Sequence, residues 1–345
     1  MQQRKDFKML DILKFFFAIC VVLRHTDLIE DYPINEWVAP LIFRISVPFF
    51  FVTSGFLLGL KVYNDDSEIS KLYKKGGYLG RLASKLFIFE PISIFLEIVL
   101  LILIGDSIKH IILYCGRSIV FYPFGALWYI QALLVAVLIL VPFIKHKKEH
   151  VIILISLLLY VIGCLGNNYF FLIQDTPLEK VMRLYLQIAR STRNGVFVGL
   201  FYVGIGCFVG KLWKRIETSK LLYCVISLLL SYILLICEVV FLKNKVSMDD
   251  RSLYLSYLLL VPSLVIIAAK MNNTFSFDTR ILRNLSTSIY LLHAPINLVF
   301  QIVFIELIGF SENHLLQTIF VCTVLTVILI PIYKNKIQPF YKVVR

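Results

Sequence analysis

Ionisable side chains interrupt an apolar stretch at residues 10–30 that otherwise has the length and composition of a membrane-spanning helix. The stretch carries Asp11, Lys14, Arg24 and His25. Each charged side chain near the centre of a bilayer costs about 2.5–3.5 kcal/mol on insertion scales, so such residues usually face a protein interior or a water-filled cavity. Histidine also exchanges protons readily near neutral pH. These residues therefore mark a candidate functional site.

The spacing of these residues predicts that three of them share one helical face. At 3.6 residues per turn, Asp11, Lys14 and His25 line up, with the small side chains of Ala18 and Val22 between them. His25 then lies about 16 Å further along the helix axis than Lys14. Asp11 and Lys14 can pair on the cytoplasmic side. The alternative is that Lys14 reaches to the interface and that His25 only forms an interhelical hydrogen bond.

Further polar residues occur within other apolar stretches. Arg44 lies about as far below the outer loop as His25, and His293 falls near mid-membrane after a run of hydroxyl residues. Trp128 and Gln131 bring amphipathic groups into another apolar helix. Two histidines and an arginine within one apolar bundle favour a functional site over simple packing.

The composition predicts an integral membrane protein of the all-α class. Of its 345 residues, 59% are hydrophobic, and the mean hydropathy is +0.82, which is too high for a soluble domain of this size. The apolar stretch at 10–30 is too long for the core of a signal peptide, and no small-residue cleavage site follows it, so we expect it to be retained. The seven cysteines show no short metal-ligand spacing. We therefore expect neither a disulfide framework nor a metal site.

Apolar runs long enough to cross a hydrocarbon core of about 30 Å predict a bundle of about ten transmembrane helices. Lys and Arg gather in the loops on the side of the N-terminus, which predicts that both termini are cytoplasmic. The net charge of +13 is then explained by basic residues that lie against anionic lipid headgroups. Binding to nucleic acid is not needed to explain this charge. The predicted spans lie near residues 10–30, 37–60, 82–104, 119–143, 150–166, 195–212, 219–241, 252–270, 281–305 and 316–333.

Five segments, taken in order, resemble the acyltransferase family 3 membrane proteins over essentially the whole chain. They are LDILKFFFAICVVLRH, FRISVPFFFVTSGFLL, GALWYIQALL, STRNGVFVGLFYVGIG and NLSTSIYLLHAPI. That family is known for a basic residue, usually arginine, followed after ten intervening residues by a histidine. Here the pair is Lys14 and His25. A late hydroxyl-x-x-Tyr-x-x-His element also matches, as Thr287, Tyr290 and His293.

The resemblance implies an enzyme that moves an acyl group, commonly acetyl, from cytoplasmic acyl-coenzyme A to a hydroxyl of a cell-surface glycan or its precursor. We expect one membrane domain over residues 1–345 in a bacterial cytoplasmic membrane. We expect no appended soluble domain, because the chain ends a few residues after the tenth predicted span. In this scheme His25 either deprotonates the acceptor or carries the acyl group itself. Arg44 would stabilise the oxyanion. Lys14, paired with Asp11, would position the donor, although it lacks the planar fork of a guanidinium.

A basic cluster on the predicted cytoplasmic side is a candidate for holding the phosphates of acetyl-coenzyme A. It consists of Lys74, Lys75, Arg81 and Lys85. The alternative is an ordinary loop that is rich in positive charge because it stays inside the cell.

On the predicted outer side, polar residues recur every three or four positions and predict one polar helical stripe that binds the acceptor. The alternative is a surface helix that lies among lipid headgroups. The predicted acceptor site also includes Arg193, Trp128 and His293. A further polar cluster on the outer side, at residues 248–251, has no assigned role. The stripe consists of Glu179, Arg183, Gln187, Arg190 and Asn194.

A second class of function remains open. The segments IFRISVPFFFVTSGF and STRNGVFVGLF also resemble the membrane domain joined to vancomycin-resistance serine racemases, which is associated with the supply of serine. A transporter or binding domain for a small polar solute would use the same buried polar groups, and inverted repeats would be its clue. We find no convincing internal repeat. A purely structural membrane protein would have no use for buried histidines and an arginine.

Overall fold

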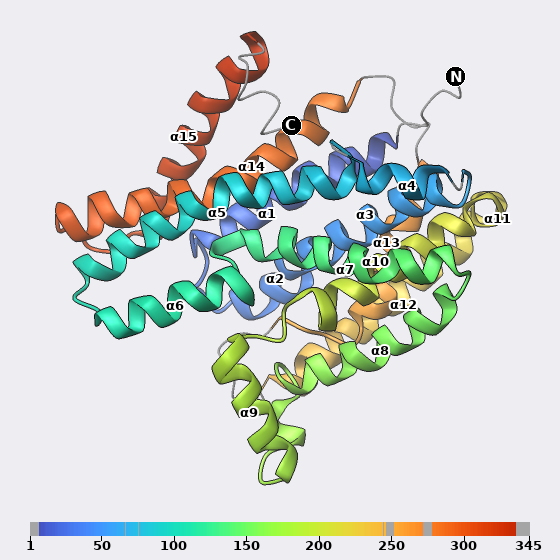
Figure 1. Cartoon of the computed structure of the whole chain (residues 1–345), viewed down its shortest axis with the longest axis horizontal. Coiled ribbons are helices and arrows are strands. Elements are labelled where there is room, and N and C mark those ends of the chain that lie inside the picture. The colour runs from blue at the N-terminus through green and yellow to red at the C-terminus, as the bar shows by residue number, and fades with distance from the viewer. Residues whose placement is uncertain are drawn as a thin grey trace.

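The computed structural model describes residues 7–65, 67–74, 76–243, 245, 252–271 and 278–335, and within these ranges it contains helices and no strands. Figure 1 shows long helices packed along a common direction. The α-helices are α1 (Lys8–His25), α2 (Asn35–Leu41), α3 (Ser46–Val62), α4 (Ser67–Tyr73), α5 (Tyr78–Leu103), α6 (Ile108–Val120), α7 (Trp128–Lys145), α8 (Glu149–Leu165), α9 (Pro177–Ala189), α10 (Leu200–Lys211), α11 (Trp213–Thr218), α12 (Leu221–Leu242), α13 (Tyr257–Lys270), α14 (Arg280–Phe300) and α15 (His314–Asn335).

Several short segments join or extend these helices. The 3₁₀ turns η1 (Phe43–Ile45) and η2 (Gly125–Leu127) lead into α3 and α7. The π-helical segments η4 (Gly195–Gly199) and η6 (Gln301–Leu307) precede α10 and follow α14. Short π-helical segments often occur at functional sites.

Within the described residues, six helical stretches are long and apolar enough to cross a membrane. Three further predicted spans correspond to the shorter apolar helices α8, η4–α10 and α13. The first predicted span is α1, which has 18 residues but carries four charged ones. The fold is therefore an all-helical membrane bundle, while the number of ten spans and the cytoplasmic location of the termini stay predictions. The six stretches are Asn35–Val62, Ser67–Leu103, Ile108–Lys145, Leu221–Leu242, Arg280–Leu307 and His314–Lys334.

The first helix is shorter than its predicted span of residues 10–30. It ends at His25, and the chain turns at Thr26 and at Asp27, which has a positive φ of 51°. His25 therefore lies in the last turn of α1, next to a loop. This position lets its side chain reach a cavity at the helix end.

The helices α3 and α10 pack together through glycines. Gly55 and Gly59 on α3 face α10, and Gly206 and Gly210 on α10 face α3. A Cβ atom added at Gly206 would lie 2.2 Å from the carbonyl oxygen of Val52. Small residues spaced by four allow membrane helices to approach this closely, because backbone packing replaces side-chain packing. This contact holds η4 and η1, which flank the two helices, near one another.

The charged helix α1 packs mainly against α14 and also contacts α3 and α13. The helices α1 and α14 run parallel. Asp11 lies near Arg283, and His25 lies near Asn297. The difference in residue number is the same for both pairs, so the two helices stay in register. Figure 1 shows α5 in front of α1, and it places α4 and α11 at one end of the bundle and α6 toward the other. The polar face of α1 is thus enclosed by other helices, as expected for charges within a membrane protein.

Candidate functional site

A cavity of about 420 Å³ opens at the His25 end of α1. This volume falls within the usual range for small-molecule sites. Its walls come from α1, η1, the start of α3, the start of α7, the segment after α9, η4, the segment before α13, and α14. The polar and aromatic residues that line it are Arg24, His25, Asp27, Phe43, Arg44, Trp128, Arg193, Ser252 and Tyr290.

His25 lines the cavity and faces a second histidine. The ring centroids of His25 and His293 are 5.2 Å apart, with the ring planes inclined by 48°. The imidazole of His25 makes no hydrogen bond with any residue that the structure describes. Both ring nitrogens are therefore available to a ligand in the cavity, and neutral imidazole can act there as a base.

His293 is 1% exposed and lies behind His25. Its Nδ1 donates to the carbonyl oxygen of Ile289 at 3.0 Å. This bond places the proton of the neutral ring on Nδ1 and leaves Nε2 as an acceptor. The buried Nε2 has no hydrogen-bond partner among the described residues. His293 thus offers one acceptor in the immediate neighbourhood of His25.

Tyr290, one turn before His293, connects α14 to the entrance of α7. Its hydroxyl donates to the carbonyl oxygen of Ala126 in η2. Gly125 begins this turn with a φ of 56°, a conformation that favours glycine, and a Cβ atom there would lie 2.8 Å from that of Ala294. The turn fixes the start of α7, and with it the position of Trp128.

Arg193 and Trp128 form one wall of the cavity. The guanidinium of Arg193 lies 5.4 Å from the ring centroid of Trp128 and 5.5 Å from that of Tyr122. The two aromatic rings are stacked, with centroids 5.9 Å apart. Such cation–π contacts hold a guanidinium in place against the aromatic rings. The structure thus brings two predicted acceptor residues to the cavity of His25.

Arg44 reaches the same cavity from η1, between α2 and α3. The expected proximity of Arg44 and His25 is therefore present in the fold. A guanidinium in this position can stabilise negative charge that develops on a bound group.

The cavity rim carries an ion-pair network that was not predicted from the sequence. Arg24 contacts Asp27 at 2.5 Å and Glu30 at 3.0 Å, and Glu30 accepts a hydrogen bond from Asn35. Partial burial raises the pKa of Asp27, and the neighbouring Arg24 guanidinium opposes this shift. The loop after α1 is thereby fastened to the start of α2.

Asp11 and Lys14 lie toward the other end of α1, and neither lines this cavity. Asp11 is a charged neighbour of Lys14, and it also contacts α14 and the residue before that helix. The carboxylate of Asp11 accepts a hydrogen bond from Thr279 at 2.9 Å and lies 3.8 Å from Arg283. Asp11 and Arg283 are the charged neighbours of Lys14. This group of three charges defines a second polar centre on the α1–α14 interface.

Arg283 was missed in the reading of the sequence, although a signal for it exists. Arg283, Tyr290 and Asn297 recur every seven residues and lie on one face of α14. The two outer members contact α1 at Asp11 and His25. A polar heptad spacing within an apolar helix would have pointed to this face.

The predicted donor-binding cluster lies away from the cavity. Arg81 is exposed and donates to the carbonyl oxygen of Gly76 at 2.7 Å, and Lys85 follows one turn later on α5. Lys74 precedes α5, while Lys75 lies outside the described residues. Arg81 and Lys85 share a helical face, but none of the three described residues of the cluster lines the cavity that contains His25.

The predicted polar stripe is only partly correct. Glu179 and Arg183 form an ion pair on α9 at 2.6 Å, but α9 ends at Ala189 because Arg190 adopts a positive φ of 66°. Arg190 and Asn194 therefore do not continue the stripe. Arg190 donates to the hydroxyl of Tyr114 at 2.6 Å.

Asn194 has a role at a helix end. Its side-chain oxygen accepts from the backbone N–H groups of Val196 and Phe197 at 2.9 and 3.1 Å, and its amide nitrogen donates to Tyr185. These bonds cap η4. The contacts of Asn194 stabilise the backbone that carries Arg193.

Comparison with known proteins identifies the family. The family model described as an acyltransferase domain matches residues 7–334. The chain therefore belongs to this acyltransferase family, and it is a membrane protein by its helices. No solved structure matches it. Among the described residues, no group of three or more His, Cys, Asp or Glu side chains could hold a metal ion.

The most similar relatives found carry racemase names. An amino-acid racemase from Enterococcus faecalis is 27% identical over 95% of this chain. A serine/alanine racemase from Enterococcus gallinarum is 28% identical over 54% of this chain. A further amino-acid racemase from Enterococcus faecalis is 24% identical over 61%. This chain spans about half the length of the first relative, 46%, and 27% and 29% of the other two.

Proposed function

We propose that this protein transfers an acetyl group from cytoplasmic acetyl-coenzyme A to a hydroxyl of a cell-surface glycan or its precursor, in the cell membrane. The main support is the placement of His25, whose imidazole faces a cavity that also holds Arg44 and Arg193. Membership of the acyltransferase family gives the reaction class. The cavity volume of about 420 Å³ suits a sugar unit together with the thioester end of a donor.

The proposed chemistry uses His25 as a general base. It removes the proton of the acceptor hydroxyl while the oxygen attacks the thioester carbonyl. Arg44 stabilises the oxyanion that forms. The carbon–sulfur bond then breaks, the new carbon–oxygen bond remains, and the coenzyme A thiolate takes up the proton from His25. In the covalent variant, a nitrogen of His25 attacks the thioester and displaces the coenzyme A thiolate. The acceptor oxygen then takes the acetyl group from His25, and the hydroxyl proton passes to the thiolate.

The second polar centre suits the donor side. Lys14, near Asp11 and Arg283, lies about 16 Å from His25 along the axis of α1. Positive charge at this depth would attract the phosphates or the polar arm of coenzyme A. Lys74, Arg81 and Lys85 would contribute charge nearer the cytoplasmic surface.

The test uses purified full-length protein in proteoliposomes with radiolabelled acetyl-coenzyme A, with and without extracted cell-surface glycan. The proposal predicts release of free coenzyme A and transfer of label to the glycan. Absence of both, with folded protein and a range of glycans, would contradict it.

A second function is favoured by the names of the relatives. Because these are racemases of amino acids, including serine and alanine, we propose as the alternative that the matched region binds or carries a small amino acid. The cavity has cationic side chains and the carboxylate of Asp27 for the two ends of such a zwitterion. Uptake of radiolabelled serine by the same proteoliposomes, without consumption of acetyl-coenzyme A, would support this function and exclude the first.

A further inference from the structure

The main-chain carbonyl of His25 has an unusual partner. The last four carbonyl groups of an α-helix lack intrahelical donors and need other partners, particularly within a membrane. At the end of α1, the side-chain nitrogen of Asn297 donates to the carbonyl oxygen of His25 at 3.0 Å. A residue of α14 thus fixes the backbone of the proposed base.

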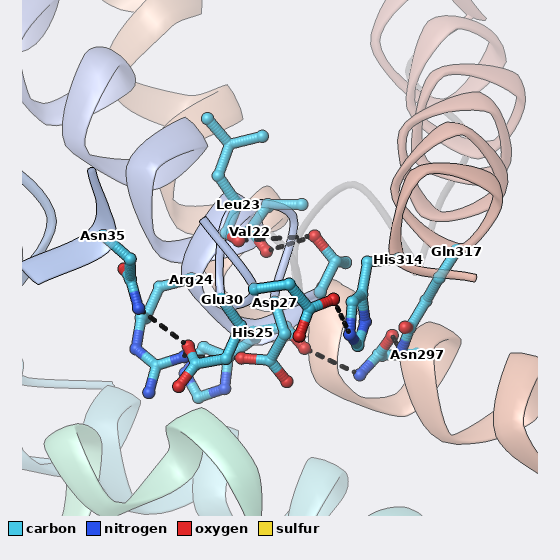
Figure 2. A network of polar contacts seen from close by, with 12 residues as sticks. Val22, Leu23, Arg24, His25, Asp27, Glu30, Asn35, Asn297, His314 and Gln317 are labelled. Atoms are coloured by element: carbon cyan, nitrogen blue, oxygen red, sulfur yellow. Dashed lines mark hydrogen bonds and ion pairs between the residues drawn. The ribbon is translucent and has the colours of Figure 1, made fainter. Parts of the chain in front are cut away.

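Gln317 of α15 sets the orientation of this amide. Its Nε2 donates to the side-chain oxygen of Asn297 at 2.7 Å, and its side chain is buried. A side-chain amide accepts through oxygen and donates through nitrogen. Because Gln317 engages the oxygen of Asn297, the nitrogen of Asn297 is directed to His25. Figure 2 shows this series of contacts from α15 through α14 to α1.

The same face of α14 also meets the ring of His25. His293 and Asn297 are four residues apart on α14 and therefore project from one side of the helix. His293 lies against the imidazole of His25, whereas Asn297 holds its carbonyl group. Two adjacent turns of α14 thus contact both the backbone and the ring of His25.

We propose that Asn297 and Gln317 are positioning residues that fix the backbone of His25 and thereby direct its imidazole into the cavity. This inference rests on the proposed role of His25 in acyl transfer. Neither side chain lines the cavity, so neither is expected to touch the acceptor. The role of Gln317 is exerted through Asn297.

The experiment compares Asn297→Ala, Gln317→Ala and the double variant in the full-length protein. Misplacement of a reacting group typically costs about tenfold to a hundredfold in rate. We expect each single variant to lower kcat for acetyl transfer within that range while leaving the KM for acetyl-coenzyme A unchanged. Because the two residues act in series, the double variant should be no slower than Asn297→Ala. If the loss of kcat in the double variant equals the product of the two single losses, Gln317 does not act through Asn297.

A matched control removes a different hydrogen bond between the same two helices. Tyr333 of α15 shares a hydrogen bond of 2.7 Å with Ser288 of α14, far along both helices from His25. Tyr333→Phe is expected to keep the wild-type kcat. A comparable loss in Tyr333→Phe would show that general loosening of α14 and α15, and not positioning of His25, explains the effect.

Chemical reactivity of His25 provides a readout that does not need turnover. The rate at which diethyl pyrocarbonate modifies His25 is measured by mass spectrometry, with exposed His146 as the internal reference. We expect a severalfold change in this ratio in Asn297→Ala and Gln317→Ala, and none in Tyr333→Phe. If the wild-type protein transfers no acetyl group, the proposed function fails, while this ratio still tests positioning.

Isosteric variants cover the case in which an alanine variant does not fold. Asn297→Asp and Gln317→Glu keep the shape of each side chain but remove its donor. Both are expected to change the reactivity of His25 in the same direction as the alanine variants. Wild-type reactivity and kcat in folded Asn297→Asp would overturn the proposal.

Discussion

The guanidinium of Arg283 on α14 lies 3.8 Å from the carboxylate of Asp11 on α1. A second contact joins the same two helices fourteen residues later on each of them, where Asn297 donates to the carbonyl oxygen of His25. Fourteen residues correspond to two heptads, so the two contacts lie on one face of each helix. The parallel pair α1 and α14 therefore connects two polar centres within an apolar bundle. One centre contains Lys14, and the other contains His25 and His293.

The first prediction concerns Lys14. Its charge lies beside Asp11 and Arg283, so Lys14→Met removes a cation from this centre at nearly constant side-chain length. We expect Lys14→Met to bind acetyl-coenzyme A about tenfold to a hundredfold more weakly, the range for loss of a hydrogen bond to a charged group. Lys14→Arg should keep substantial activity because it restores the charge. Calorimetry on the purified variants measures both affinities, and wild-type affinity in Lys14→Met would remove Lys14 from the donor site.

The second prediction concerns Arg193. Because Trp128 and Tyr122 hold its guanidinium at the cavity wall, Arg193→Gln should weaken acceptor binding and raise the acceptor KM by about tenfold. The KM for acetyl-coenzyme A should not change. Arg183→Gln, on α9 outside the cavity, is the control. An unchanged acceptor KM in Arg193→Gln would place the acceptor elsewhere.

The third prediction concerns His293. Because its buried ring lies against that of His25 and does not line the cavity, His293→Ala should impair chemistry less than loss of His25 does. We expect a smaller loss of kcat than in His25→Ala and an unchanged acceptor KM. Steady-state kinetics at saturating acetyl-coenzyme A separate the two parameters. Equal losses of kcat in the two alanine variants would instead show that the histidines act as a unit.

The fourth prediction concerns the packing of α3 on α10. In Gly206→Ala the added methyl group meets the backbone of Val52 at 2.2 Å, which forces the helices apart. Overpacking of this kind costs about 1–3 kcal/mol. The thermal unfolding temperature in detergent should fall. Gly116→Ala serves as control because no atom lies within 4 Å of the added Cβ, and equal stability of the two variants would contradict the close contact.

Much of the fold followed from apolar periodicity and length. The helical class could be predicted from this pattern. The polar face of α1 could also be predicted, because charged residues are costly in a membrane and therefore lie on the side of the helix that faces the protein interior. The end of α1 was not. Residues 26–30 read as a continuation of the helix, but Asp27 has a positive φ and its carboxylate pairs with Arg24.

Polar residues that stand out within an apolar segment could be predicted as members of the candidate site. Contacts with partners from distant segments could not be predicted. His25, Arg44, Trp128 and Arg193 were expected and meet at one cavity. Asp11 was expected near Lys14 because the two residues share one helix, whereas the contact of Asp11 with Arg283 comes from α14 across the interface. The contact of Gln317 with Asn297 depends on the packing of α15, which no local spacing reveals.

The most direct test of the account is acetyl transfer by His25→Ala. Wild-type protein and the variant are reconstituted at equal amounts, and the label moved from acetyl-coenzyme A to glycan is followed over time. Loss of a positioned base costs about a hundredfold to ten-thousandfold in rate. The account predicts at least the lower of these losses in a variant that is folded and membrane-inserted. Wild-type turnover by folded His25→Ala would contradict the central role of this histidine.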